Sequence, residues 1–166
     1  MSPTDITIKK LEKSNWEQVR EIYIEGLATR NATFQTEAPC WDIWDETHHH
    51  VGRLVAVVDG KVVGWCALTP ISSRPVYRGV AEVSIYISKK YTNKGIGSQL
   101  MNSLIKGSEA QGVWTLQASI FPENETSILL HKKFGFRIVG RREKIAQLDG
   151  IWRDTILVER RKRINY

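Results

Sequence analysis

The sequence predicts an α/β fold, a mixed sheet with helices between its strands. Two apolar runs, 54–58 and 62–68, flank Asp59-Gly60, a strong signal for a two-residue hairpin between antiparallel strands. The run 82–87 alternates like a strand and leads through a glycine-bearing loop into an amphipathic helix. Segments of strand and helix character then alternate toward the C-terminus, as an α/β fold requires.

The first third of the chain carries a strand and two helices. Ile6-Thr7-Ile8 alternates like a short strand, and a helix is expected to follow from a cap at Ser14. A second helix is expected over 41–50, and 71–79, with serines, a proline and Gly79, reads as a loop. The apolar positions of the first helix recur at helical spacing and are Trp16, Val19, Ile22, Tyr23 and Leu27.

The second half begins with the helix after the glycine loop. Ile96, Leu100 and Leu104 form its apolar stripe, and Gly112 is placed to end it as a C-terminal cap. The remaining elements are expected in the order strand, helix, strand, strand, over residues 114–120, 124–134, 136–139 and 151–158.

The size and net charge of the chain limit its domain count and its possible binding partners. The chain of 166 residues is 42% hydrophobic and suits a single domain, 1–166. Its 24 Lys and Arg against 18 Asp and Glu give a net charge of +6, which favours nucleic acid, an anionic membrane or a polyanionic cofactor. Much of the excess lies at 160–163, expected to be a solvated tail. No aromatic residues alternate with these charges, so nucleic acid is not the expected partner.

Cysteine and histidine usage predicts neither a disulfide framework nor a metal. Cys40 and Cys66 lack metal-ligand spacing, which fits a reducing compartment. Neighbouring histidines at 48–50 cannot converge on one ion and are expected to form a solvated helix end. The segment Met1–Lys13 lacks the apolar core of a signal peptide, and no run is long enough to span a bilayer. These features predict a cytoplasmic protein without a membrane partner.

The junction between the strand at 82–87 and the next helix is the best candidate for a binding site. A helix N-terminus directs unpaired backbone N–H groups and a positive dipole end outward, so an anion is expected there. No segment has the glycine, lysine and serine order of the ATPase phosphate loop. The dinucleotide fingerprint is also excluded, because its third glycine would fall at Leu100.

From Glu82 to Ser98 the chain resembles the acetyl-CoA-binding core of the GNAT acetyltransferases. The usual loop begins with Gln or Arg where this chain has Thr92. A second block, from Asn124 through His131 to Phe134-Gly135-Phe136, is similar to the family's following helix and strand entry. The resemblance implies a twisted, mostly antiparallel sheet whose central strands splay apart to admit the pantetheine arm.

This resemblance implies acetyl-CoA as cosubstrate. In the family the loop holds the pyrophosphate through main-chain N–H groups, and the splayed strand offers a backbone N–H to the thioester carbonyl. The cofactor-binding residues implied are Asn93, Lys94, Gly95, Ile96, Gly97 and Ser98 of the loop, Ile85, Tyr86 and Ile87 of the strand, and Asn124.

Glu82 and His131 are the candidate catalytic residues. A strand places Glu82 on the face opposite Val83, where a carboxylate is usually just solvated. A primary amine with a pKa of about 10 must lose a proton before it can attack a thioester. The resemblance to phosphinothricin-type enzymes implies that Glu82 is the general base and that His131 protonates or stabilises the departing thiolate. In the alternative reading His131 lies in solvent.

Three residues are candidates for binding the substrate. The blocks that contain Phe34, Arg74 and Tyr77 resemble their counterparts in phosphinothricin and methionine sulfoximine acetyltransferases, and so does 150–154 with Trp152. An arginine suits a substrate carboxylate because its guanidinium can donate two parallel hydrogen bonds, so Arg74 is the choice for that role. The aromatic residues could instead serve as packing, with Trp152 in the core.

The expected activity is therefore transfer of an acetyl group to the primary amine of a small amino acid or analogue. A protein N-terminus or a polyamine is the nearest alternative, and the basic segment at Arg74 and Arg78 favours an anionic substrate over a polyamine. A CoA-sensing domain without catalysis is a further alternative. The presence of both candidate catalytic residues, Glu82 and His131, argues against it. Relatives of this type are commonly homodimers, so a homodimer is expected.

Overall fold

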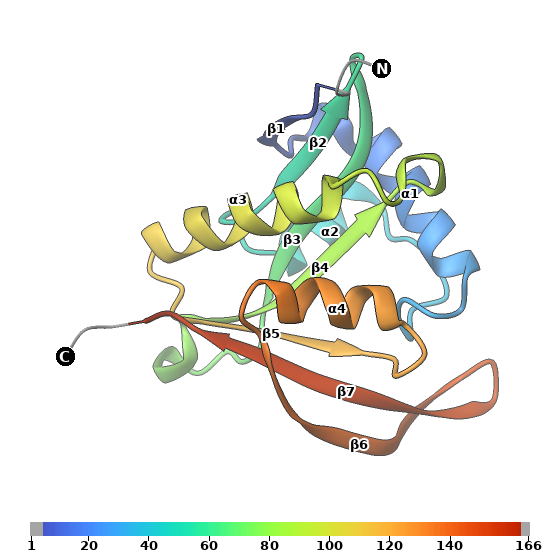
Figure 1. The fold of residues 1–166 in the computed structure, drawn as a ribbon, viewed down its shortest axis with the longest axis vertical. Coiled ribbons are helices and arrows are strands. Elements are labelled where there is room, and N and C mark those ends of the chain that lie inside the picture. The colour runs from blue at the N-terminus through green and yellow to red at the C-terminus, as the bar shows by residue number, and fades with distance from the viewer. Residues whose placement is uncertain (1–4, 164–166) are drawn as a thin grey trace.

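A computed structural model describes residues 5–163, which form a seven-stranded sheet in the order β1-β2-β3-β4-β5-β7-β6. Helices α3 and α4 lie in front of the sheet in Figure 1, and α1 and α2 lie behind it. The strands are β1 Thr7–Lys10, β2 Leu54–Val58, β3 Lys61–Pro70, β4 Val80–Ile87, β5 Thr115–Ile120, β6 Arg137–Leu148 and β7 Ile151–Arg161. The helices are α1 Trp16–Ala28, α2 Trp41–Thr47, α3 Ile96–Ala110 and α4 Glu125–Lys133.

The predicted mixed, mostly antiparallel sheet is confirmed. Each neighbouring pair of strands is antiparallel except β4 and β5, which are parallel. The hairpin between β2 and β3 turns at Asp59 and Gly60, which have φ angles of 49° and 76°, as a tight two-residue turn requires.

The central strands β4 and β5 splay apart, as predicted. Their pairing ends at Glu82↔Gln117, although β4 continues to Ile87 and β5 to Ile120. Figure 1 shows the two arrows diverging beyond this point, with α4 in front of the gap. The divergence leaves one edge of β4 without a neighbouring strand in the described part of the chain, so its main-chain N–H and C=O groups face the gap.

Two apolar cores, one on each face of the sheet, hold the helices in place. The front core contains the predicted stripe of α3, and the core behind contains all the predicted apolar positions of α1. Successive side chains of β4 point to opposite faces of the sheet, so the strand contributes to both cores: Val83 packs in front and Tyr86 packs behind. β4 is therefore fixed from both faces while one of its edges stays open.

Two predicted helix ends were wrong. Helix α1 begins after Asn15 and not after a cap at Ser14, because a 3-10 turn over Lys13–Asn15 precedes it. Helix α2 ends at Thr47, three residues earlier than expected, because His48 takes an extended conformation with ψ of 147°. Local sequence did not reveal this end, which depends on contacts to Arg53 described below.

The C-terminal hairpin is longer than the sequence predicts. β6 continues nine residues beyond Val139, and β7 continues to Arg161. Most of β6 is exposed at the edge of the sheet and carries register shifts, so it lacks the apolar alternation by which a strand is recognised. The expected solvated tail at 160–163 is wrong for Arg160, whose guanidinium pairs with Glu109 and donates to the carbonyl of Phe134 at 3.0 Å.

Among residues 5–163, no helix is both long enough and apolar enough to cross a membrane.

Candidate active site

A cavity of about 800 Å³ opens where β4 and β5 part. Residues 82–86 of β4 and 118–121 at the end of β5 form two of its walls. The connection 32–39 between α1 and α2 forms a third wall, and one side of α4 with its N-cap, at Asn124, Ser127 and His131, forms a fourth. A cavity of this size lies within the range of small-molecule sites.

The glycine loop lies at the start of α3. Gly95 is the N-cap of α3 with φ of 77°, a left-handed conformation that glycine adopts without strain, and no side chain caps the helix. The first amides of α3 have no carbonyl within the helix to bond, so they are free to bind an anion. Glycine is needed at position 97 for packing. A Cβ there would lie 3.2 Å from Leu130 Cδ2, so the lack of a side chain lets α4 approach α3 closely.

Cations surround this helix end. Lys94 Nζ lies 4.9 Å from the centre of the Tyr91 ring, and Lys133 Nζ donates to Ser98 Oγ at 2.9 Å. Thr92, at the position where Gln or Arg is usual, donates its hydroxyl to the carbonyl of Lys89 at 3.2 Å. Free amides, a helix dipole and nearby ammonium groups together suit a polyanion such as a diphosphate. The residues present therefore fit the diphosphate of coenzyme A.

Glu82 lies at the last paired position of β4, where the two strands separate. Its backbone is held on both sides, by Thr69 of β3 and by Gln117 of β5, and its side chain is half-buried and lines the cavity. Ile85 and Tyr86 also line the cavity, further along the open edge of β4. A carboxylate at a fixed position in the wall of a cavity can accept a proton from a bound amine.

His131 lies on α4 and lines the same cavity. Its side chain is 2% exposed, so the reading that leaves it in solvent is wrong. Nδ1 lies 2.7 Å from the carbonyl oxygen of Ser127, which can only accept, so Nδ1 carries a proton. Nε2 is buried and has no hydrogen-bond partner in the described residues. Burial lowers the pKa of His131 below its usual value, which leaves a neutral ring with a lone pair at Nε2.

Asn124 is the N-cap of α4. Its Oδ1 accepts from the amide of Ser127 at 3.2 Å, and its Nδ2 donates to the carbonyl of Asn31 at 3.2 Å. The side chain therefore ties α4 to the connection between α1 and α2. It also lines the cavity.

Arg153 of β7 holds the same connection from the other side. Its guanidinium donates to the carbonyl of Arg30 at 2.9 Å and to Asn31 Oδ1 at 3.3 Å, and it lies 4.0 Å from the centre of the Phe121 ring. Phe121 in turn meets Phe34 edge to face at 4.9 Å. A segment without regular structure is thus fixed beside the cavity, and Phe34 both packs and lines the wall.

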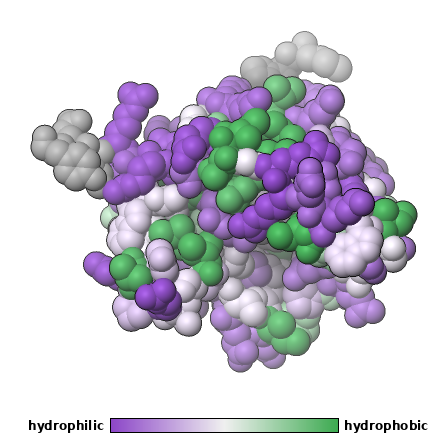
Figure 2. Space-filling view, turned by 90° about the horizontal axis from the view of Figure 1, so that it is seen from below, coloured by the Kyte–Doolittle hydropathy of each residue, from purple (hydrophilic) through white to green (hydrophobic). Residues whose placement is uncertain are grey.

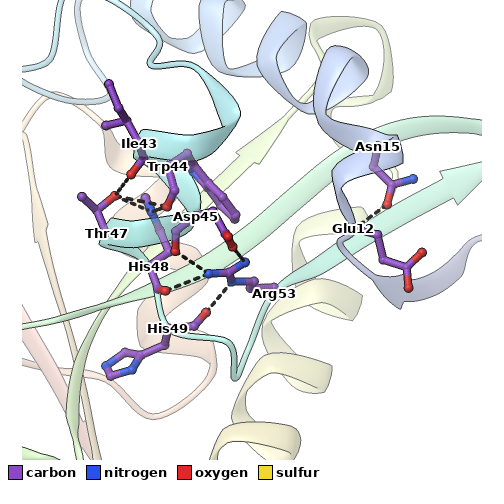
Figure 3. Close-up of polar contacts among 9 residues, drawn as sticks. All are labelled: Glu12, Asn15, Ile43, Trp44, Asp45, Thr47, His48, His49 and Arg53. Carbon is purple, nitrogen blue, oxygen red and sulfur yellow. Dashed lines mark hydrogen bonds and ion pairs between the residues drawn. The ribbon is translucent and has the colours of Figure 1, made fainter.

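Arg53 organises the segment after α2 (Figure 3). Its buried guanidinium pairs with the Asp45 carboxylate, and it donates to the carbonyls of Asp45 and His48 at 2.8 Å and of His49 at 2.6 Å. These bonds satisfy carbonyls at the C-terminal end of α2 and explain why the helix stops there. Nothing in the local spacing of the sequence identifies Arg53 as this partner.

His48 does not form the solvated helix end that the sequence suggested. Its ring stacks on Trp44 at 4.2 Å, and its Nδ1 donates to the carbonyl of Trp44 at 2.7 Å. Burial lowers the pKa of His48 to about 4, so the ring is neutral at physiological pH. His48 and Trp44 line the cavity, which sequence reasoning missed; the pair of tryptophans at 41 and 44 was the available signal.

Two of the predicted substrate residues do not reach the cavity in the described structure. Arg74 and Tyr77 are exposed on the loop before β4, where the guanidinium lies 5.7 Å from the centre of the Tyr77 ring. Arg78 lies against Trp114, 5.5 Å from the ring centre. Trp152 is 56% exposed, so the alternative that places it in the core is wrong.

Fold and site together define an acyl-CoA-dependent transferase, because parted strands beside an open helix N-terminus suit a long thioester whose anionic end binds at the helix. The acetyltransferase (GNAT) family model matches residues 15–136, so the chain belongs to this family. GNAT acetyltransferases use acetyl-CoA.

Individual relatives agree with this assignment. The L-amino acid N-acetyltransferase AaaT of Escherichia coli is 29% identical, over 96% of this chain and 99% of its own. An L-methionine sulfoximine/L-methionine sulfone acetyltransferase of Pseudomonas aeruginosa is 31% identical over 70% of this chain and 69% of its own. The structure of a phosphinothricin acetyltransferase from Sinorhizobium meliloti in complex with acetyl-CoA superimposes with a TM-score of 0.84, at 27% identity over 94% of this chain and 88% of that one.

Proposed function

We propose that this protein transfers the acetyl group of acetyl-CoA to the primary amine of a small amino acid or amino-acid analogue. The observation that carries the proposal is the gap between β4 and β5, which opens into one cavity lined by Glu82 and His131. The names of the relatives support the class of acceptor, since they act on L-amino acids and on methionine sulfoximine, methionine sulfone or phosphinothricin.

Residues from three elements would hold the cosubstrate. The amides of 93–98 suit the diphosphate, and the open edge of β4 at 85–87 suits the amide-rich arm and the thioester carbonyl. Asn124 lines the cavity beside them, although its amide already bonds Asn31 and Ser127. When bound, acetyl-CoA supplies an acetyl thioester whose acetyl group passes to the amine with release of the thiol.

Two protons must leave an ammonium group before it becomes an amide, and the site has two acceptors. Glu82 takes the first, which frees the lone pair of the amine for attack. His131 takes the second at Nε2, the ring nitrogen that carries no proton in the neutral ring. The sequence-based role, a proton donor to the thiolate, therefore requires that His131 first gain the proton it later gives. One proton stays with the thiol, and Glu82 returns the other to solvent.

A thiol-release assay tests the proposal. Purified protein is incubated with acetyl-CoA and with methionine sulfone, methionine sulfoximine, phosphinothricin, ordinary L-amino acids, spermidine or a short peptide. Saturable thiol release with at least one amino acid or analogue, and an N-acetylated product by mass spectrometry, is the expected result. Turnover of spermidine or the peptide alone would assign the rival acceptors, and acetyl-CoA binding without any turnover would assign a CoA-sensing domain.

A homodimer is part of the same proposal. The face seen from below, along which β6 lies, carries apolar patches among hydrophilic side chains (Figure 2). Of the exposed large hydrophobic side chains in the described residues, five lie on the C-terminal hairpin: Ile138, Val139, Ile145, Ile151 and Trp152. Such a concentration is typical of an association surface. Sedimentation equilibrium should give twice the mass of one chain, whereas a single-chain mass at micromolar concentration would contradict association.

The free thiols Cys40 and Cys66 support the cytoplasm as the compartment in which the protein acts.

A further inference from the structure

The acceptor cavity has an unbalanced set of charged groups. Among its lining residues in the described structure, Glu37 and Glu82 carry carboxylates, and neither lysine nor arginine occurs. The two histidines in the wall, His48 and His131, have lowered pKa values because of burial and contribute no compensating positive charge. An anionic group that enters this cavity beyond the reacting amine would therefore find no cationic partner.

Two arginines that hold segments beside the cavity wall, Arg153 and Arg53, are already committed to other partners. Arg153 bonds Arg30, Asn31 and Glu123, and Arg53 bonds Asp45 and the carbonyls that follow α2. Neither lines the cavity. Arg74 and Arg78, whose basic segment was the argument from the sequence for an anionic substrate, lie on the loop before β4 and outside the lining. The basic segment therefore no longer supports an anionic substrate.

Six of the lining side chains are aromatic, and the others include hydroxyl and amide groups such as those of Thr33, Gln35 and Ser84. Tyr86 stacks on Trp65 at 4.9 Å, and Trp44 meets Trp65 edge to face at 5.9 Å. These rings belong to a larger aromatic set that comes from α1, α2, β3, β4 and the segments beside them, and its members that line the cavity are Tyr23, Phe34, Trp44, Trp65, Tyr86 and Phe121. An aromatic wall gains most from covering an apolar or polarisable side chain.

We propose that the cavity selects amino-acid acceptors with an uncharged, largely apolar side chain over those with an anionic side chain. The inference rests on the proposed function and narrows its acceptor class. Every α-amino acid brings the same amine and carboxylate to the reacting end, so these groups cancel in a comparison. The comparison therefore depends on the side chain, where an anion loses hydration and meets only neutral hydrogen-bond donors, without a cation.

The test compares acceptors that differ in side-chain charge at similar size. Methionine sulfone against phosphinothricin and glutamine against glutamate form two such pairs, assayed for kcat/KM by thiol release. The uncharged member of each pair should be preferred by about tenfold or more, the factor expected for a charge left without a partner. Equal values, or preference for phosphinothricin or glutamate, would overturn the inference and leave the acetyltransferase activity itself intact.

A matched pair of variants locates the effect in the cavity. Ile43 of α2 lines the cavity and is 56% exposed, so Ile43→Lys adds a cation at the wall without disturbing the core. It should shift the preference toward the anionic member of each pair by about fivefold or more. Ile24→Lys adds the same charge on α1 at a side chain that is 42% exposed and outside the lining, and it should leave the ratio unchanged. Equal shifts in both variants would assign the effect to net charge and overturn the inference.

Discussion

Replacement of Glu82 by glutamine is expected to lower kcat by about 100-fold or more, the usual contribution of a general base. The glutamine keeps the shape of the side chain at the point where β4 and β5 separate, but it cannot accept a proton. Because Glu82 lies on β4 and the glycine loop begins α3, affinity for acetyl-CoA should stay within about twofold, since the diphosphate site belongs to a different element. Steady-state kinetics and calorimetric titration with CoA measure the two quantities.

Glu37→Gln is the matched control for Glu82→Gln. Glu37 also lines the cavity, but it is exposed and lies on the connection between α1 and α2. Its loss removes the same charge, so kcat should change by no more than about twofold if charge alone has little effect. If Glu82→Gln retained full turnover at every pH, or if both variants lost activity equally, Glu82 would have no role as a base.

Replacement of His131 by glutamine should lower kcat by about 10- to 100-fold, at the lower end of acid–base contributions. The amide of glutamine can form hydrogen bonds but cannot exchange a proton as Nε2 does. Since His131 is 2% exposed, circular dichroism and thermal unfolding must show that the variant is folded. His50→Gln is the control, because His50 is exposed and outside the cavity lining, and it should retain full activity.

The pH profile separates a proton-transfer role of His131 from a packing role. Burial lowers the pKa of the folded histidine below its usual value of about 6.5, and the mechanism requires the neutral ring. The contribution of His131 should therefore be complete at pH 6.5 and above, and it should be lost as the pH falls through the lowered pKa. His131→Gln should remove the contribution of His131 to the acid limb of kcat, so the shape of the limb should change even though Glu82 must still be ionised to act as a base. A variant whose limb keeps the same shape, with a uniformly reduced rate, would indicate packing alone.

Much of the fold follows from local pattern. Helix α1 buries the apolar positions that its spacing marks, because a 3.6-residue period places them on one side of any helix. Asp59-Gly60 forms its hairpin because both residues accept positive φ. Most of the edge strand β6 beyond Val139 was not predicted. Its side chains are mainly exposed, so burial imposes no apolar alternation on its sequence.

For the site, the sequence alone determined the chemical groups: a glycine loop at a helix start, Glu82 before it and His131 after it. Only the tertiary structure decided how they meet. The proton position on His131 depends on the carbonyl of Ser127 and on burial between elements, and the end of α2 depends on Arg53. Likewise, Arg74 is outside the cavity and Trp44 is in its wall because of packing between distant segments. Local spacing fixes which face a residue takes on its own element, but contacts across the fold decide what that face meets.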